Sequence, residues 1–486
     1  MESVFLVPMC AVASFMLVGN AGRRRCLQAL PWLSLAVIVA MGGWETAAAA
    51  LLLIVPGFLL REWLGARPAT ARVGSAVALV VLWYAVLKDY FGIGQRLLGG
   101  MGSSNLTSLL QALGLSFVVF RVVEYLLSSR GIDMGLPKHV PRPPSNGGRA
   151  MLRRLHAYVG FCLAYPAFTS GPILRWRGYT TDYWDESPIF CDESDIRSTL
   201  RRIANGLLKL GLVSQPLLLM VNGFAAELGA GQNASLGHAI LFDAAAIFYL
   251  HFLYLNFASF SEVMIGAGRF IGLRLPENFD RPFTAKGFLE FWSHWNLSVS
   301  FWFRDLMFTP IVKQFVMRGV RSNTVCSSIA YVLTFGTLGL WHGRTWPFLL
   351  CGLMLALGAL GNQLYRDFVG KSGRLGGGAL QRAGTYLYIS LAILGLWLPS
   401  TTIAGYWSGY RSWQPWLALP LVVIAYGVLL ASVDACVNSM PRACHALARA
   451  WQAESPWLSA AKLSLAVLFW AWFAVDGQRA FVYEGF

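Results

Sequence analysis

Charged residues are scarce in this chain of 486 residues, where Asp, Glu, Lys and Arg together make up 13% of the sequence. A soluble domain carries about 25%. Cysteine is scarce as well, and 8 scattered cysteines in a chain of this length exclude a disulfide scaffold. Hydrophobic residues make up 56%. This composition excludes a disordered chain and a soluble globular enzyme, and it predicts an all-α polytopic membrane protein.

Negative charge is the rarer sign, with 24 acidic residues against 39 Lys and Arg and a formal net charge of +15. We expect no nucleic-acid partner, because basic residues of membrane proteins collect in short cytoplasmic loops. The loops predicted at 21–26, 61–72 and 128–154 are basic and are therefore placed in the cytoplasm. The connection 174–200 differs, since it holds a quarter of all acidic residues.

A signal peptide is not predicted at the start of the chain. Residues 1–20 are apolar, but the basic cluster Arg23–Arg25 follows this run, whereas a signal peptide carries its charge before the apolar run. We expect a retained first transmembrane helix, with the N-terminus outside.

Linkers and repeats are lacking too. No Pro/Gly/Ser-rich linker separates a soluble domain, and no internal repeat suggests an inverted-repeat transporter, so one domain is predicted over 1–486. Stretches of about 20 apolar residues predict about 11–13 transmembrane or re-entrant helices. They lie near 3–20, 27–43, 46–60, 73–88, 105–127, 155–173, 203–222, 235–258, 326–342, 346–364, 383–398, 415–432 and 457–475.

The stretch 276–314 does not have the composition of a membrane span. Its aromatic residues alternate with His, Asn, Arg and Asp, which lipid would penalise heavily. Such a segment belongs in the protein interior, at the membrane interface or along a cavity. An interfacial amphipathic helix with a belt of tryptophans is an equally good interpretation of the pattern alone.

A second unusual feature is the run from Gly339 to Gly343. It contains His342, an ionisable residue, near the end of an apolar stretch. An ionisable residue inside a membrane segment is by default a candidate for function, although a single buried histidine can also be a hydrogen-bonded structural residue. The flanking glycines allow another backbone or a substrate to approach closely.

Together these two segments resemble the membrane-bound O-acyltransferase family. The bacterial branch that acetylates alginate and other exopolysaccharides and D-alanylates teichoic acids is the most similar. The matching blocks are Phe257-Ala258-Ser259-Phe260-Ser261, Leu275-Pro276-Glu277-Asn278-Phe279, Phe291-Trp292-Ser293-His294-Trp295-Asn296-Leu297-Ser298-Val299-Ser300, Trp302-Phe303-Arg304-Asp305 and Gly339-Leu340-Trp341-His342-Gly343. The order and spacing of the two central motifs make the resemblance specific.

One position departs from the family pattern, because the second family histidine falls on Asn296 and the preceding family arginine on His294. Eukaryotic members of the family often carry Asn at this position. If the segment is helical, residues two apart point about 200° apart, so the two side chains cannot share one narrow cavity. The alignment favours Asn296, and His294 is the alternative.

Acyl transfer from a thioester to a sugar hydroxyl, which the resemblance implies, needs a base, donors for the oxyanion and exclusion of water. We predict that His342 is the base and that Asn296 orients or polarises a reactant. Arg304 and Asp305 are expected to form a structural ion pair beside the cavity. The further residues predicted to support the cavity are Trp295, Ser298 and Trp341.

The resemblance also implies a ring of helices around a central funnel, in a bacterial inner membrane. N-terminal helices would occupy 1–113, a core with both motifs 114–365, and C-terminal helices 366–486. The donor would be an acyl-CoA or an acyl-carrier thioester, most simply acetyl-CoA. No bound cofactor or metal is expected, because the sequence has no Gly-rich phosphate loop and no metal-ligand set. The acceptor would be an extracytoplasmic polysaccharide, or a periplasmic protein that relays the acetyl group. The chain itself would contact membrane lipids.

Three other functions fit parts of the sequence. D-alanyl transfer to teichoic acid is the main alternative within the same family. A non-catalytic glycan transporter fits the composition and the span count, but not the aromatic block with its Trp-His-Gly motif. A family member that has lost catalysis would rest on the departure at Asn296 alone.

Overall fold

Helices form the regular structure of this protein. The structure, a computed structural model, describes residues 3–18, 23–65, 70–87, 115–128, 148–168, 171–185, 187–230, 235–343, 345–369, 378–409 and 413–439, with positions 462 and 464. No β-strand occurs within these ranges, which confirms the predicted all-α class. The predicted span 457–475, apart from those two positions, and the first part of 105–127 lie outside the described residues.

The chain divides into two compact units. The first consists mainly of Met1–Gly206 and Phe260–Glu277, and the second mainly of Leu207–Ser259 and Asn278–Asp476. The single domain over 1–486, with divisions after 113 and 365, stays a prediction, as does the central funnel.

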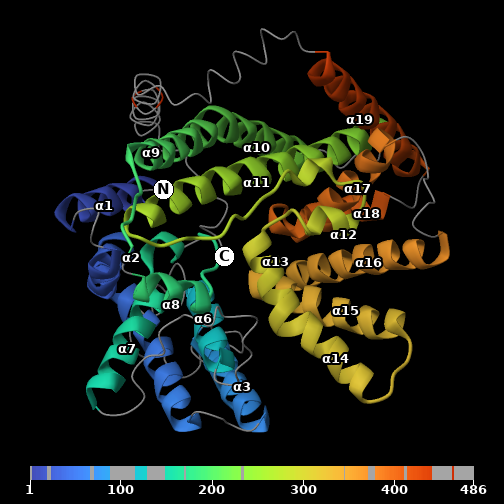
Figure 1. The fold of residues 1–486 in the computed structure, drawn as a ribbon. Coiled ribbons are helices and arrows are strands. Elements are labelled where there is room, and N and C mark those ends of the chain that lie inside the picture. Colours follow the sequence, from blue (N-terminus) through green and yellow to red (C-terminus); the bar gives the residue numbers. More distant parts are fainter. Residues whose placement is uncertain are drawn as a thin grey trace, which may run out of the picture. The chain divides into compact units, whose positions relative to one another are not determined.

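The first unit is built around a long, kinked helix (Figure 1). Its helices are α1 (Ser3–Val18), α2 (Arg23–Leu64), α3 (Thr70–Leu87), α6 (Leu115–Leu127), α7 (Gly148–Leu163), α8 (Trp176–Trp184) and the greater part of α9 (Glu193–Leu208). Helix α2 packs against α3, α6 and α7. It bends at Gly43, whose φ of 75° lies in the left-handed region that glycine adopts without strain. The kink falls at the junction of the spans predicted at 27–43 and 46–60.

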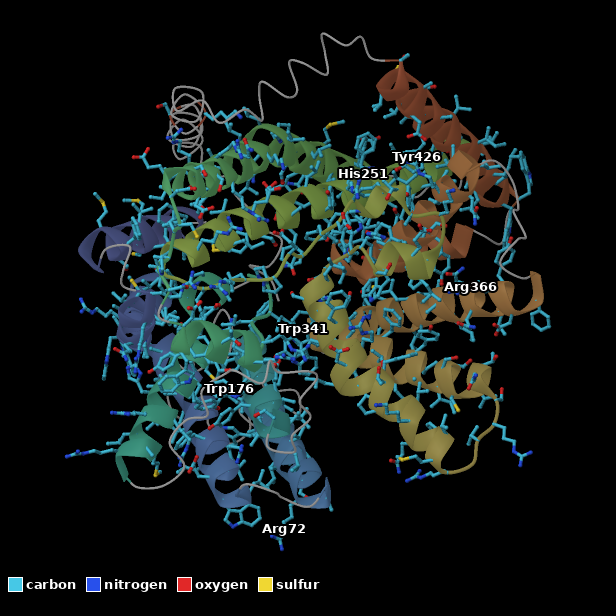
Figure 2. All side chains as sticks on the ribbon, viewed as in Figure 1. Arg72, Trp176, His251, Trp341, Arg366 and Tyr426 are labelled. Atoms are coloured by element: carbon cyan, nitrogen blue, oxygen red, sulfur yellow. The ribbon has the colours of Figure 1, made fainter. Side chains whose placement is uncertain are left out.

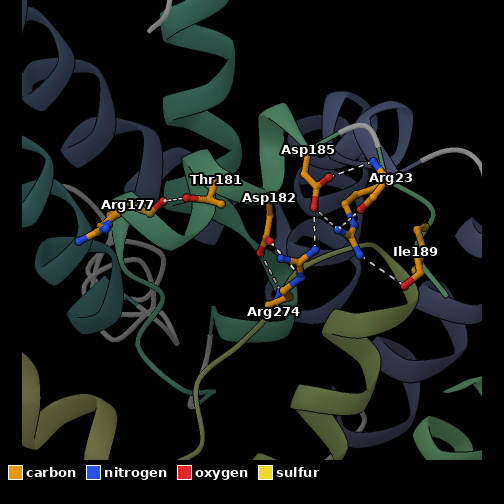
Figure 3. A network of polar contacts seen from close by, with 8 residues as sticks. Arg23, Arg177, Thr181, Asp182, Asp185, Ile189 and Arg274 are labelled. Atoms are coloured by element: carbon orange, nitrogen blue, oxygen red, sulfur yellow. Dashed lines mark hydrogen bonds and ion pairs between the residues drawn. The ribbon is translucent and has the colours of Figure 1, made fainter. Parts of the chain in front are cut away.

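A polar network holds the start of α2 against the end of α8 (Figure 3). Arg23 is buried and forms an ion pair with Asp185, which Arg274 also contacts at 2.6 Å. Burial alone would raise the pKa of Asp185, but hydrogen bonds from Ser187 and the guanidinium groups of Arg23 and Arg274 lower this pKa to about 2. The acidic connection 174–200 thus neutralises part of the basic segment at the start of α2.

The second unit contains the two motifs that the sequence singled out. Its helices are α10 (Gln215–Ala230), α11 (Leu236–Phe270, up to Ser259), α12 (Phe288–Trp292), α13 (Leu297–Phe303), α14 (Thr309–Met317), α15 (Asn323–His342), α16 (Trp346–Val369), α17 (Gly378–Ala392), α18 (Ser400–Gly409) and α19 (Gln414–Asn438). Helices α15 and α16 pack closely together, and α17 packs against α16 and α19. The side chain of Ser322 caps α15 by accepting a hydrogen bond from the Val325 amide.

A histidine joins α11 to α19 within this unit. His251 Nδ1 donates to the carbonyl of Ile247 at 2.9 Å, so its Nε2 accepts from the hydroxyl of Tyr426 at 3.0 Å. Figure 2 shows the two labelled residues beside each other. The ring of His251 also stacks on Phe283, with centroids 4.4 Å apart. These contacts give His251 a structural role between the two helices.

Six helices among the described residues are long and apolar enough to cross a membrane. They are Gly43–Leu64, Glu193–Leu228, Leu236–Phe270, Asn323–His342, Trp346–Phe368 and Trp416–Val437. The span Glu193–Leu228 consists of α9, the π-helical segment η4 (Lys209–Ser214) and most of α10, which follow one another without a break. Two shorter apolar helices are Val7–Met16 and Ala71–Val86. This set confirms a multi-pass membrane protein, whereas the total of about 11–13 crossings stays a prediction.

Candidate active site

The segment around Asn296 is a turn between two short helices. Helix α12 ends at Trp292, residues 293–296 form the turn, and α13 begins at Leu297. The assumption of a continuous helix, which placed His294 and Asn296 about 200° apart, is therefore wrong. The chain leaves the helical conformation because Asn296 has a left-handed backbone, with φ 44° and ψ 56°.

Asn278 holds this turn in place. Its backbone carbonyl accepts a hydrogen bond from the Leu297 amide at 2.8 Å, and its side-chain Oδ1 accepts from the Ser298 amide at 3.4 Å. The amide of Asp280 donates to the carbonyl of His294 at 3.1 Å. Sequence reasoning gave Asn278 no role, although it lies in one of the blocks that carry the family resemblance. Its position in that block was the feature of the sequence that could have indicated a role for Asn278.

Asn296 carries a buried side chain with an unsatisfied polar atom. The residue is 8% exposed, and its Oδ1 has no hydrogen-bond partner among the described residues. Such an oxygen can accept a hydrogen bond from a bound molecule, although it shares this state with other buried polar atoms of the described residues, such as Asn256 Oδ1. The backbone conformation also explains why Asn stands here, because Asn and His are among the residues enriched at positive φ.

His294 lies in a more open environment. Its side chain is 32% exposed, and its Nδ1 lies 3.5 Å from a carboxylate oxygen of Asp280. This Nδ1 atom is buried and makes no hydrogen bond among the described residues, as is true of Asn296 Oδ1, so only the exposure of the side chains separates the two residues. Trp295, in contrast, is buried, with its ring stacked on Phe291 at 5.2 Å. Ser298 is buried as well. The burial of Asn296 makes it the better candidate of the two rival residues.

Arg304 and Asp305 lie in a π-helical segment, η6 (Arg304–Phe308), which follows α13 directly. Arg304 Nε is 2.9 Å from the Asp305 carboxylate, and its guanidinium lies 4.5 Å from the ring centre of Phe301. The structure thus shows the expected ion pair. Its place beside a cavity stays a prediction.

His342 is the last residue of α15, and its ring lies 4.6 Å from that of Trp341, which Figure 2 labels. The elements that carry the two motifs contact each other. Trp292 packs edge-on against Phe335 of α15 at 5.0 Å, and η6 also packs against α15. Asn296 and His342, the two predicted catalytic residues, therefore belong to the same unit, and elements before and after the Asn296 turn contact the helix that ends in His342.

The glycines around His342 allow α16 to approach. A Cβ added to Gly339 would lie 2.3 Å from the backbone carbonyl oxygen of Phe348, and one added to Gly343 would lie 2.2 Å from the Phe348 ring. Gly352 faces Gly339 in the same way, with its Cβ position 2.3 Å from the carbonyl of Phe335. Of the two explanations that the sequence left open for these glycines, close backbone approach is the one that the structure shows.

Replacing Gly339 by alanine is expected to disrupt the α15–α16 contact, because backbone atoms cannot move aside as a flexible side chain can. We expect a loss of about 1–3 kcal/mol in stability, as for other overpacked sites. Gly336→Ala is the matched control on the same helix, since its Cβ would meet nothing within 4 Å. Thermal unfolding in detergent would measure both, and equal melting temperatures would contradict the packing described here.

No set of metal ligands occurs in the part of the chain that the structure describes. Within those ranges no group of three or more His, Cys, Asp or Glu side chains could hold a metal ion.

The helical fold and the apolar spans define a class, that of multi-pass membrane proteins. Residues 152–402 match the membrane-bound O-acyltransferase family (MBOAT), and this match covers more than half of the chain. The chain belongs to this family, which confirms the resemblance found in the sequence.

Two kinds of curated relative are similar to the chain. One is a teichoic acid D-alanyltransferase of Streptococcus thermophilus, 28% identical over 263 residues, or 53% of this chain and 58% of the relative. Another is a probable alginate O-acetylase, AlgI, of Pseudomonas fluorescens, 27% identical over 320 residues, or 66% of this chain and 58% of the relative. The match thus spans less than two thirds of the length of either relative.

Proposed function

We propose that this protein is a membrane O-acyltransferase that moves an acyl group, most simply acetyl, from a cytoplasmic thioester to hydroxyls of an extracytoplasmic polysaccharide or of a partner protein. The observation that carries this proposal is the buried side-chain oxygen of Asn296, which has no hydrogen-bond partner among the described residues. Asn296 lies in a turn between α12 and α13, and both α12 and the following η6 contact the helix that ends in His342. Membership of the acyltransferase family supports the reaction class.

In the proposed mechanism, His342 removes the proton of the acceptor hydroxyl as its oxygen attacks the thioester carbonyl. Because the reacting hydroxyl gives its single proton to His342, Asn296 Oδ1 accepts a hydrogen bond from another hydroxyl of the acceptor, and the amide N–H of Asn296 can donate to the developing oxyanion. The tetrahedral intermediate then collapses, the C–S bond breaks, and the proton on His342 passes to the departing thiolate. An ester C–O bond replaces the thioester bond, and no acyl-enzyme is formed.

The alternative acyl group is D-alanyl. It is supported by the relatives named teichoic acid D-alanyltransferase, whose identity of 28% is close to the 26–28% of the relatives named as probable alginate O-acetylases. Acetyl and D-alanyl transfer need the same base and oxyanion donors. They differ in the donor, which is acetyl-CoA in our proposal and an acyl-carrier thioester in the alternative.

The test supplies each donor to the purified protein in nanodiscs. Radiolabelled acetyl-CoA and a D-alanyl carrier-protein thioester are offered separately, together with host polysaccharide and with teichoic acid. We expect label on polysaccharide from acetyl-CoA alone. Label only from the D-alanyl donor would replace the acetyl proposal by the alternative, and label from neither would contradict both and favour a transporter or a non-catalytic family member.

A further inference from the structure

Helix α17 contacts the segment that precedes the Asn296 turn through three side chains on one of its faces. Arg382, Thr385 and Tyr386 are three and four residues apart, so they lie on the same side of the helix. Each donates a hydrogen bond to a backbone carbonyl of residues 283–286. The bonds join Arg382 Nη2 to Phe283 O (2.9 Å), Thr385 Oγ1 to Lys286 O (3.1 Å) and Tyr386 Oη to Ala285 O (2.8 Å).

The backbone of residues 283–286 needs such partners. It forms only part of a single 3₁₀ turn, Pro282–Thr284, before α12 begins at Phe288. A buried backbone carbonyl needs a hydrogen-bond partner, and Ala285 is fully buried, whereas Thr284 and Lys286 are exposed. Arg382 is itself held by Asp434 of α19, at 2.6 Å, so its guanidinium is anchored on both sides.

A chain of packed rings leads from this segment to the Asn296 turn. The ring of Phe291 lies 6.0 Å from that of Phe283 and 5.9 Å from that of Tyr386. It also stacks on Trp295, the neighbour of Asn296, at 5.2 Å. A shift of the 283–286 backbone would therefore be transmitted to the turn through rigid aromatic contacts.

We propose that α17 is a positioning clamp for Asn296. Its three donors fix the backbone of residues 283–286 and, through the rings, the direction of the Asn296 amide. This inference rests on the proposed function, because it assigns Arg382, Thr385 and Tyr386 the task of aligning a group that contacts the reactants. They are positioning residues, since none of them is placed at the reacting atoms.

A matched pair of tyrosines separates positioning from simple helix stability. Tyr386→Phe deletes the hydroxyl that binds Ala285 and keeps the ring. Tyr388→Phe, two residues further along α17, deletes a hydroxyl that donates to the carbonyl of Met354 on α16 at 2.5 Å. Each variant loses one tyrosine–carbonyl hydrogen bond, but only the first loses a bond to the segment before Asn296.

The kinetic test measures kcat and KM for acyl transfer in nanodiscs. Tyr386→Phe is expected to lower kcat about 3–10-fold with little change in the KM of the donor, as expected when one hydrogen bond ceases to hold a group in reactive alignment. Tyr388→Phe should stay within about 2-fold of wild type. In an Asn296→Gly background, Tyr386→Phe should have no further effect, because the group to be aligned is absent. Equal losses in both tyrosine variants, or an undiminished effect in that background, would overturn the clamp.

Hydrogen–deuterium exchange gives a readout that does not depend on turnover. Backbone amides of residues 287–298 should exchange faster in Tyr386→Phe than in wild type, while Tyr388→Phe leaves their exchange unchanged. Unchanged exchange in both variants would refute the clamp even if the enzyme is active. If exchange is faster only in Tyr386→Phe and wild type transfers no label from any donor, the contact of α17 with the Asn296 segment is supported and the proposed function is refuted.

Discussion

Replacing His342 by alanine is expected to lower kcat for acyl transfer by about 10²–10⁴-fold, the usual contribution of a positioned general base. The substitution removes the group that takes the hydroxyl proton and leaves the close contact between α15 and α16 intact, since that contact is made by Gly339 and Gly352. The measurement is label transfer from the thioester donor by wild type and variant, with elution from a sizing column as the test of folding.

Two controls make this result specific. His238→Ala changes a histidine in the first turn of α11 and should leave kcat unchanged. Added imidazole should restore part of the activity of His342→Ala, because a small base can enter the space that the side chain vacates. A folded His342→Ala that works as well as wild type would remove His342 from the mechanism and bring His294 forward as the base.

Removing the Asn296 side chain is expected to lower kcat about 10²-fold or more, as for other donors that stabilise an oxyanion. Two variants separate this effect from backbone strain. Asn296→Gly deletes the amide and suits the left-handed backbone at φ 44°, whereas Asn296→Ala deletes it and adds about 1–2 kcal/mol of conformational strain. Both should lose the same activity, and only the alanine variant should also lose thermal stability.

Asn296→His gives the complementary test. Histidine tolerates the same backbone conformation and has a ring nitrogen that can donate or accept a hydrogen bond, so this variant should keep measurable activity where glycine does not. A pH–rate profile would show whether the new ring titrates during turnover. Wild-type activity in Asn296→Gly would contradict the role given to Asn296, and His294 would then be the residue to test.

Composition and long apolar runs were sufficient to predict the class of this protein. Six helices of the described chain meet the length and hydropathy of a membrane span, and several begin and end close to the predicted bounds, such as 326–342 within α15. The glycines beside His342 could be recognised as sites of close approach, because the absence of a Cβ is visible in the sequence. What approaches them, the backbone of α16, could not be known without the fold.

The local geometry of the site was harder to predict. The aromatic block 291–305 has enough helix-forming residues to suggest one helix, and a single left-handed residue, Asn296, divides it. Such a break depends on the long-range hydrogen bonds of Asn278, which no periodicity reveals. The α17 clamp joins residues about one hundred positions apart, so its partners become apparent only once the helices are packed.

The most direct test of the central claim is the stoichiometry of the reaction. Purified protein in nanodiscs would be supplied with radiolabelled acetyl-CoA and host polysaccharide, and free CoA and polysaccharide-bound label would be measured together over time. We expect the two to rise in equal amounts in wild type and to be nearly absent in folded His342→Ala. Neither product from wild type with acetyl-CoA or with a D-alanyl carrier thioester would contradict the assignment of this protein as an acyltransferase.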